Sequence, residues 1–338
     1  MTDFVEKPAS LRDYGADCQP SEIRFLAAAG GFSGAAFWQL QTPRGQLCLR
    51  LWPVEHPKRE RLEQMHQLLR HVAGECDVPL PLPIETNEGR SYTERDGRLW
   101  QLEPWMPGEA NFQAQPTDER LTAAMVALAK FHNAAASFPS PEVRTAVSPG
   151  IAARLEKLQS WTDQRMTELL QQIQSRRRDE LLPVYKHVRD IVTNFRAAAP
   201  AVQKYLKASA SSELTLIPCI RDIHDGHVLF QGCEVSGLID FGSFNFDHPT
   251  CDVARLLGSL VGDDVRLRQE GLAAYEELRP LVLSDRALVR VWDQSTTLLS
   301  GMNWLEWIFL DRRQFESYHA VGERLARISQ RLSYLARG

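Results

Sequence analysis

The sequence lacks closely paired cysteines, an excess of basic residues and long apolar runs. A formal net charge of −4 argues against a general nucleic-acid binder. No run approaches the roughly 20 apolar residues that span a bilayer, so we expect no membrane association. The chain begins without a basic and apolar leader, and none of its cysteines form a C-x-x-C pair. We therefore predict that the protein is cytoplasmic and that its cysteines are reduced. The six cysteines are Cys18, Cys48, Cys76, Cys219, Cys233 and Cys251.

What the sequence does contain is enough chain for two lobes. Its 338 residues are too many for most single hydrophobic cores. Residues 25–105 have the pattern of strands with one helix, and the pattern turns helical from Pro116 onward. Between them, Pro104 and the pair Pro107-Gly108 break the last strand. We predict an α+β protein with an N-terminal lobe (1–108) and a larger helical C-terminal lobe (109–338).

A glycine-rich segment enters the first predicted hairpin. The sequence GGFSG, which contains Gly31, Ser33 and Gly34, precedes strands predicted at 35–40 and 47–52. Such a loop can fold over a polyphosphate and offer it backbone N–H groups. Taken alone, the glycines are explained as well by a loop that needs positive φ angles.

Two further polar features belong to the N-terminal lobe. Arg50 is the one cation among the apolar residues of the second strand, where it either grips a phosphate or faces outward on an alternating strand. A helix predicted from His56 carries Glu60 and Glu63 one turn apart, and both are equally well explained as solvated residues near a helix N-terminus.

The most informative stretch runs from residue 219 to 257. Apolar runs at 228–230 and 235–239 flank a Gln231-Gly232 turn, which predicts a β-hairpin with Phe230 opposite Val235. That hairpin brings the residues before Val228 beside Asp240, and Asp222 and Asp240 together suit a divalent cation. Asp222 alone is typical of a turn residue.

Within this stretch the sequence resembles the aminoglycoside phosphotransferase and choline kinase family. The segments RDIHDGHVLF (221–230), GLIDF (237–241) and DVA (252–254) correspond to family motifs of the form H-G-D-L-H-x-G-N-V-L, I-D-F and D-x-A. The resemblance implies a protein-kinase-like fold with two lobes. It also implies an ATP-dependent phosphotransferase that acts on a hydroxyl group of a small molecule, with Mg²⁺ or, as the alternative, Mn²⁺.

The resemblance also assigns roles to individual residues. Asp222 becomes the catalytic base, Asp240 the metal-binding acid, and Asp252 the acid that braces the catalytic loop. Arg50 becomes the contact to the nucleotide phosphates, under the loop that contains Gly31, Ser33 and Gly34, and Glu63 is favoured slightly over Glu60 as its partner. Trp105 and Met106 fall in the segment whose backbone contacts adenine.

The sequence departs from the family pattern in one metal ligand. His227 stands where the family has a metal-binding asparagine. Mg²⁺ prefers oxygen ligands, whereas a neutral imidazole suits zinc, copper and iron. Two alternatives therefore remain beside the kinase. One is a metal-dependent hydrolase that uses Asp222, His224, Asp225, His227 and Asp240, and the other is a kinase-like module that binds nucleotide without turnover.

Overall fold

The computed structural model divides into two compact units. Unit 1 comprises residues Met1–Pro139 and Asp222–Phe244, and unit 2 comprises Ser140–Arg221 and Asn245–Gly338. The lobe boundary suggested by the sequence at residue 108 lies within unit 1 and stays a prediction. The described residues are 7–26, 34–139, 145–176, 178–315 and 317–337.

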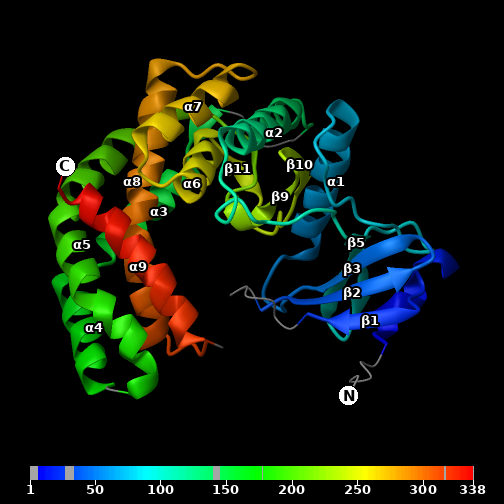
Figure 1. Cartoon of the computed structure of the whole chain (residues 1–338), viewed down its shortest axis with the longest axis horizontal. Helices are drawn as coiled ribbons and strands as arrows, with labels where there is room; N and C mark the ends of the chain where they lie inside the picture. Colours follow the sequence, from blue (N-terminus) through cyan, green and yellow to red (C-terminus); the bar gives the residue numbers. More distant parts are fainter. Residues whose placement is uncertain (1–6, 27–33, 140–144, 177, 316, 338) are drawn as a thin grey trace. The chain divides into compact units, whose positions relative to one another are not determined.

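Unit 1 contains a five-stranded antiparallel sheet with the strand order β1-β2-β3-β5-β4 (Figure 1). The two strands predicted around the first hairpin are present as β2 and β3. Gly45 opens β3 at a φ of 113°, which glycine adopts without the steric cost that a Cβ brings. The strands are β1 (Glu22–Phe25), β2 (Ala36–Thr42), β3 (Gly45–Leu51), β4 (Thr93–Arg95) and β5 (Arg98–Pro104).

Alternation along β3 gives its two faces different environments. Leu47 and Leu49 belong to a buried apolar cluster on one side of the sheet. Because successive side chains point to opposite faces, Arg50 lies on the other side. The sequence of the strand thus buries leucines and aims one cation away from them. The cluster consists of Leu11, Tyr14, Cys18, Leu40, Leu47, Leu49, Ile84 and Leu102.

Two helices that pack on each other, α1 (Arg59–Glu75) and α2 (Asp118–Ala136), also belong to unit 1. The Thr117 hydroxyl caps α2, because it accepts the backbone N–H of Arg120 at 3.2 Å. An apolar stripe runs along the first helix. Its members are all buried in α1, namely Leu62, Met65, Leu68, Leu69 and Val72.

The hairpin predicted in the 219–257 stretch is formed by β9 (Val228–Gln231) and β10 (Glu234–Leu238). Phe230 pairs with Val235, as the turn signal predicts, and a bulge follows before Gly237. The pairing continues past the strands, since the Ile239 N–H donates to the His227 carbonyl at 3.0 Å. His227 and Asp240 therefore come together at the open end of the hairpin.

Unit 2 is mainly helical, with two short two-stranded sheets. β6 (Thr145–Val147) pairs with β7 (Glu213–Thr215), and β8 (Ile217–Cys219) pairs with β11 (Asn245–Asp247). The long helix α5 packs against both α8 and α9 (Figure 1). The helices are α3 (Pro149–Gln159), α4 (Asp163–Ser175), α5 (Leu182–Ser209), α6 (Thr250–Leu260), α7 (Val265–Glu276), α8 (Leu283–Leu305) and α9 (Tyr318–Leu335). No helix in the described ranges combines the length and apolar character needed to cross a bilayer.

A buried histidine in unit 1 makes the stability of the protein dependent on pH. His66 is fully buried, with Nδ1 2.7 Å from Ser91 Oγ and Nε2 3.0 Å from Gln101 Oε1. Burial lowers the pKa of His66 from 6.5 to about 4. The unfolded chain takes up this proton near pH 6.5 and the folded chain only near pH 4. Keeping His66 neutral in the folded chain therefore costs no stability above pH 6.5. As the pH falls toward 4, the unfolded chain gains a proton that the folded chain does not, and the free energy of unfolding decreases.

We expect the free energy of unfolding to fall by about 3 kcal/mol between pH 7 and pH 4 through His66 alone. Urea denaturation at the two pH values measures this loss. The variant His66→Gln removes the titrating group, so it should lose correspondingly less. Equal losses in the two proteins would show that His66 does not carry the effect.

Candidate functional site

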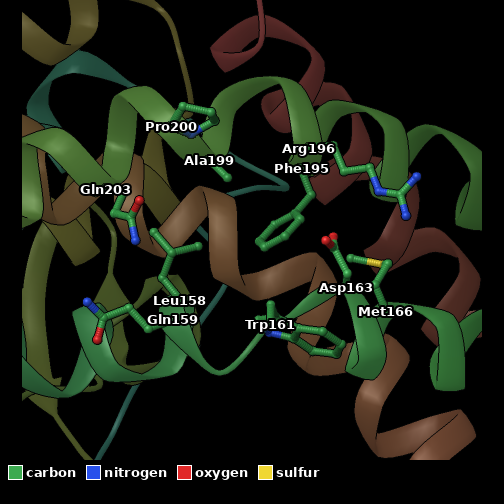
Figure 2. A pocket seen from close by; sticks show the side chains of 10 residues that line it. All are labelled: Leu158, Gln159, Trp161, Asp163, Met166, Phe195, Arg196, Ala199, Pro200 and Gln203. Carbon is green, nitrogen blue, oxygen red and sulfur yellow. The ribbon is translucent and has the colours of Figure 1, made fainter.

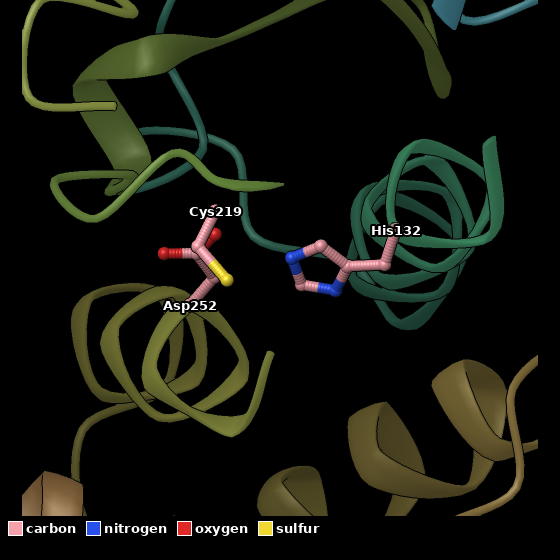
Figure 3. A group of neighbouring side chains, drawn as sticks. All are labelled: His132, Cys219 and Asp252. Carbon is pink, nitrogen blue, oxygen red and sulfur yellow. The ribbon is translucent and has the colours of Figure 1, made fainter. Parts of the chain in front are cut away.

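The loop that carries Asp222 follows β8 and is fixed on its N-terminal side by Asp252. The carboxylate of Asp252, in the first turn of α6, accepts the backbone N–H groups of Ile220 and Arg221, both at 2.7 Å. Asp252 is fully buried and lies beside Cys219 (Figure 3). The prediction that Asp252 braces this loop is therefore confirmed.

Arg221, the residue before Asp222, is held in an unusual backbone conformation. Its φ is 72°, a left-handed value that costs a non-glycine residue roughly 1–2 kcal/mol. Its Nη1 pairs with the buried carboxylate of Asp247 at 2.8 Å. Side chain and backbone are thus each tied to a carboxylate, and together these bonds offset the strain. The side chain of Arg221 is therefore already paired with a neighbouring acid.

The ring nitrogen Nε2 of His227 and the carboxylate oxygen Oδ2 of Asp240 point toward each other. The Nδ1 of His227 lies 3.0 Å from the Asp222 carbonyl oxygen, and its Nε2 lies 3.7 Å from Asp240 Oδ2. A carbonyl only accepts hydrogen bonds, so in the neutral ring Nδ1 carries the proton and Nε2 carries the lone pair. Asp240, like Arg221, has a left-handed φ, of 61°. A lone pair and a carboxylate oxygen that converge without a proton between them form a donor set for a cation.

The electrostatic environment favours this arrangement. Burial, and then the neighbouring His224, lower the pKa of His227 and so favour the neutral ring. Burial acts to raise the pKa of Asp240, but the charge and hydrogen bond of Arg50, together with His227 and the Gly242 N–H, outweigh it and lower the pKa overall. Burial raises the pKa of Glu103, beside Arg50 on the same sheet, to about 7. Asp240 is therefore the reliably ionised carboxylate of the group at neutral pH.

Arg50 forms the cationic side of the same site. Its Nη2 donates to Asp240 Oδ1 at 2.9 Å, which leaves Oδ2 directed toward His227. The guanidinium stacks on Trp52, 3.6 Å from the ring centroid. Its buried Nε has no hydrogen-bond partner among the described residues. An unsatisfied buried N–H is unfavourable, so this atom is a natural donor to an anionic ligand.

The structure corrects one expected pairing. Glu63 does not pair with Arg50, because its Oε1 accepts the hydroxyl of Tyr92 at 2.7 Å and the ion-pair partner of Arg50 is Asp240. A helix pattern gives the face of a residue but not the segment it meets, and Tyr92 occupies the position in front of Glu63. A role for Glu63 in cofactor binding stays a prediction.

The glycine-rich loop is described only at its end. Gly31 and Ser33 lie outside the described residues. Gly34 has a φ of 71°, so the need for a positive φ angle is real at this position. Its contact with a nucleotide stays a prediction.

The segment after β5 is joined to the hairpin by backbone bonds. Glu109 exchanges two hydrogen bonds with Phe230, at 3.0 and 3.1 Å, and the Ser236 hydroxyl donates to the Pro107 carbonyl at 2.6 Å. Trp105 donates its N–H to Gln46 at 3.0 Å and is 36% exposed. Met106 lies against Gly237, where an added Cβ would come within 3.1 Å of the Met106 side chain. Trp105 and Met106 thus belong to the unit that holds Arg50 and Asp240, which the sequence alone could not establish.

The five-residue cluster considered for a hydrolase does not form one metal centre. His224 stacks on His227, with 3.8 Å between ring centroids, and its Nδ1 accepts the Gly226 N–H at 3.0 Å. Within the described part of this cluster, no three ligand atoms lie within 4.8 Å of one another. Two converging ligands, His227 and Asp240, remain. A hydrolytic site with three protein ligands is therefore not supported.

Unit 2 contains a cavity among its helices. Its volume is about 300 Å³, and it lies among α3, α4 and α5 (Figure 2). The buried Trp161 contributes an indole N–H that has no partner in the described structure. The cavity lining comprises Leu158, Gln159, Trp161, Asp163, Met166, Phe195, Arg196, Ala199, Pro200 and Gln203.

Comparison with known proteins identifies the family of the chain. The sequence profile described as the phosphotransferase enzyme family matches residues 24–292. No curated protein matches the chain.

Several solved structures share the fold at low sequence identity. An amicoumacin kinase in complex with AMP-PNP, Ca²⁺ and Ami aligns with a TM-score of 0.66 and 14% identity, over 94% of this chain and 89% of that one. An aminoglycoside phosphotransferase from Alicyclobacillus acidocaldarius aligns at 0.63 and 16%, over 98% and 95%. A microcompartment-associated aminopropanol kinase aligns at 0.61 and 14%, over 97% and 95%. These likenesses confirm the predicted kinase-like α+β fold.

Proposed function

Because the chain belongs to the phosphotransferase enzyme family, we propose that it transfers the γ-phosphoryl group of ATP to a hydroxyl group of a small molecule. The observation that carries this proposal is the meeting of Arg50, His227 and Asp240 within unit 1. One side of Asp240 faces a guanidinium with an unused donor, and the other faces a lone pair. This is the charge pattern that a cation-bound polyphosphate requires.

In this proposal, Asp222 accepts the proton of the acceptor hydroxyl and orients its oxygen for attack. The transition state of phosphoryl transfer needs little covalent help, so the work of the protein is positioning and charge neutralisation. Arg50 supplies positive charge to the phosphates, and the backbone of the segment at Trp105 and Met106 binds the base. The glycine loop that contains Gly31, Ser33 and Gly34 covers the phosphates.

His227 and Asp240 would hold the divalent cation, Mg²⁺ or Mn²⁺. The donor set fits a cation because Nε2 and Oδ2 lie 3.7 Å apart with the imidazole tautomer fixed by the Asp222 carbonyl. When bound, such an ion would neutralise the charge that develops on the phosphate oxygens.

Turnover tests the proposal. ATP consumption is measured with Mg²⁺ and with Mn²⁺ across a panel of hydroxylated metabolites, together with thermal stabilisation by AMP-PNP. We expect stabilisation by AMP-PNP with a divalent cation, and ADP formation that depends on one class of acceptor. Binding without turnover on any acceptor would favour the inactive kinase-like module. The absence of both would refute the assignment.

The imidazole ligand leads to a prediction about metal preference. Mn²⁺ accepts nitrogen ligands more readily than Mg²⁺ does, so wild-type protein should bind AMP-PNP about 10-fold more tightly in Mn²⁺ than in Mg²⁺. His227→Asn offers an amide oxygen in place of the nitrogen, and it should bring this ratio close to one. Isothermal titration calorimetry in the two metals gives the ratio.

His224→Asn is the matched control, because His224 stacks on His227 but does not face Asp240. It should keep the wild-type ratio. A ratio that is unchanged in His227→Asn would exclude the imidazole as a ligand.

A further inference from the structure

Arg154, on α3, carries a positive charge without a carboxylate partner. Its two hydrogen bonds, to the Gly150 carbonyl and to Thr296 Oγ1, are both 3.4 Å long and therefore weak. Its guanidinium lies 4.4 Å from the centroid of the Trp292 ring. No carboxylate of the described ranges lies within ion-pair distance of it. A part-buried charge that lacks a counter-ion is unfavourable, and a bound anion would remove that cost.

The nearby carboxylate is already satisfied. Asp247 is fully buried and accepts from Arg221 at 2.8 Å, from the Gly150 N–H at 3.1 Å and from the hydroxyl of Ser148. Its ion-pair partner is therefore Arg221, and its charge acts on Arg154 only from beyond ion-pair distance.

Charges of both signs act on Arg154, since Asp247 raises its pKa while two neighbouring arginines lower it. Burial lowers the pKa of Arg154 to about 10, and repulsion from Arg221 and Arg255 acts in the same direction. The group nevertheless remains protonated at neutral pH.

Gly150 brings the two arginines to one backbone position. Its carbonyl faces Arg154, and a Cβ added to it would lie 3.0 Å from Arg221 Nη2 and 2.5 Å from Asp247 Oδ2. The close approach of Asp247 and Trp292, at 2.5 and 2.7 Å from that Cβ position, thus requires a residue without a side chain here, and Arg221 lies just beyond them.

Glu306, a carboxylate of unit 2 at the end of α8, does not provide a binding site for a cationic group. The Glu306 side chain is 7% exposed and pairs with both Lys157 and Arg165. Its charge is more than balanced by these two groups, so it is a poor partner for an amino group of a substrate.

We propose that Arg154 and Arg221 bind an anionic group, a carboxylate or a phosphate, on the molecule that receives the phosphoryl group. The planar fork of a guanidinium matches both groups in a bidentate way. This inference rests on the proposed phosphotransferase function, because Arg221 is joined by a peptide bond to Asp222, the proposed base. The acceptor is then a hydroxy acid or a phosphorylated alcohol or sugar, and not an amino alcohol or an aminoglycoside.

A charge series of small acceptors tests this inference with the wild-type protein. Glycerate, glycerol 3-phosphate, glycerol and 3-amino-1,2-propanediol share a hydroxylated backbone and differ in charge. Their binding is measured by calorimetry with and without AMP-PNP and Mn²⁺. At least one anion should bind 10-fold or more tightly than glycerol, and the amine should bind no better than glycerol. The two anions separate a carboxylate site from a phosphate site.

Variants of Arg154 link the preference to this side chain. Arg154→Gln should weaken binding of the preferred anion about 10- to 100-fold, and Arg154→Lys should weaken it less, because it keeps the charge but loses the fork. The exposed Arg189 of α5 provides a charge-matched control as Arg189→Gln. Affinity for AMP-PNP should be unchanged in all three variants, which also reports that they are folded.

Two outcomes would overturn the inference. One is wild-type protein that binds glycerol or the amine as tightly as both anions. The other is Arg154→Gln that binds the anion as wild type does. Failure of AMP-PNP to bind, by contrast, would count against the nucleotide site in unit 1, and the anion series without nucleotide would still decide the role of Arg154.

Discussion

Replacing Asp222 with asparagine is expected to lower kcat by about 10²- to 10⁴-fold, the range that general-base catalysis contributes. The amide keeps the size of the side chain but cannot accept the proton of the acceptor hydroxyl. The backbone on either side of Asp222 is fixed independently of its carboxylate, by the bonds of Arg221 to Asp252 and by the bond of His227 to the Asp222 carbonyl. The fold and the affinity for nucleotide should therefore survive the substitution, and steady-state kinetics with AMP-PNP titration separates the two effects.

Asp225→Asn is the matched control for this prediction. Asp225 lies in the same loop, with its carboxylate 3.5 Å from His224 Nδ1. It should keep kcat within a few-fold of wild type. A larger loss in Asp225→Asn than in Asp222→Asn would reassign the base, and a loss of AMP-PNP binding in Asp222→Asn would mean that the residue serves the nucleotide.

Replacing Asp240 with asparagine is expected to weaken binding of AMP-PNP in Mn²⁺ by about 100-fold. The substitution removes the charged oxygen that faces His227 and the negative partner of Arg50 at once. A buried guanidinium that loses its counter-charge is costly, so stability should fall as well, by about 3 kcal/mol. Calorimetry measures the affinity and urea denaturation measures the stability.

Glu103→Gln serves as the control for Asp240. Its carboxyl also lies near Arg50, but burial raises its pKa to about 7, so it is partly protonated at neutral pH and the amide resembles its protonated form. The control should change the affinity by no more than a few-fold. An equal loss of AMP-PNP affinity in Asp240→Asn and Glu103→Gln would show that the total negative charge near Arg50 matters and that Asp240 is not a specific metal ligand.

The local features of this protein were readable from sequence because each depends on a short stretch. The register of the β9–β10 hairpin follows from the Gln231-Gly232 turn between two apolar runs, and the cap at Thr117 follows from a threonine before a helical pattern. The position of Arg50 on the face opposite Leu49 follows from strand alternation. In each case the residues that decide the structure lie within a few positions of one another.

The partners of these residues were not readable. Arg50 and Asp240 are 190 positions apart, and nothing in either stretch distinguishes Asp240 from Glu63 as the partner of Arg50. Asp247 is a stronger example. It is fully buried, and it accepts hydrogen bonds from Arg221 and from the Gly150 N–H. Such roles depend on how distant segments pack, which periodicity and propensity do not encode.

Pulsed EPR of Mn²⁺ bound with AMP-PNP tests the central claim most directly, because it detects the nuclei that ligate the metal. The claim is that His227 and Asp240 hold the cation that accompanies the nucleotide. Wild-type protein should show nitrogen coupling from an imidazole that disappears in His227→Asn and remains in His224→Asn. Bound Mn²⁺ without any imidazole coupling in the wild type, or nucleotide binding that is unaffected by EDTA, would contradict it.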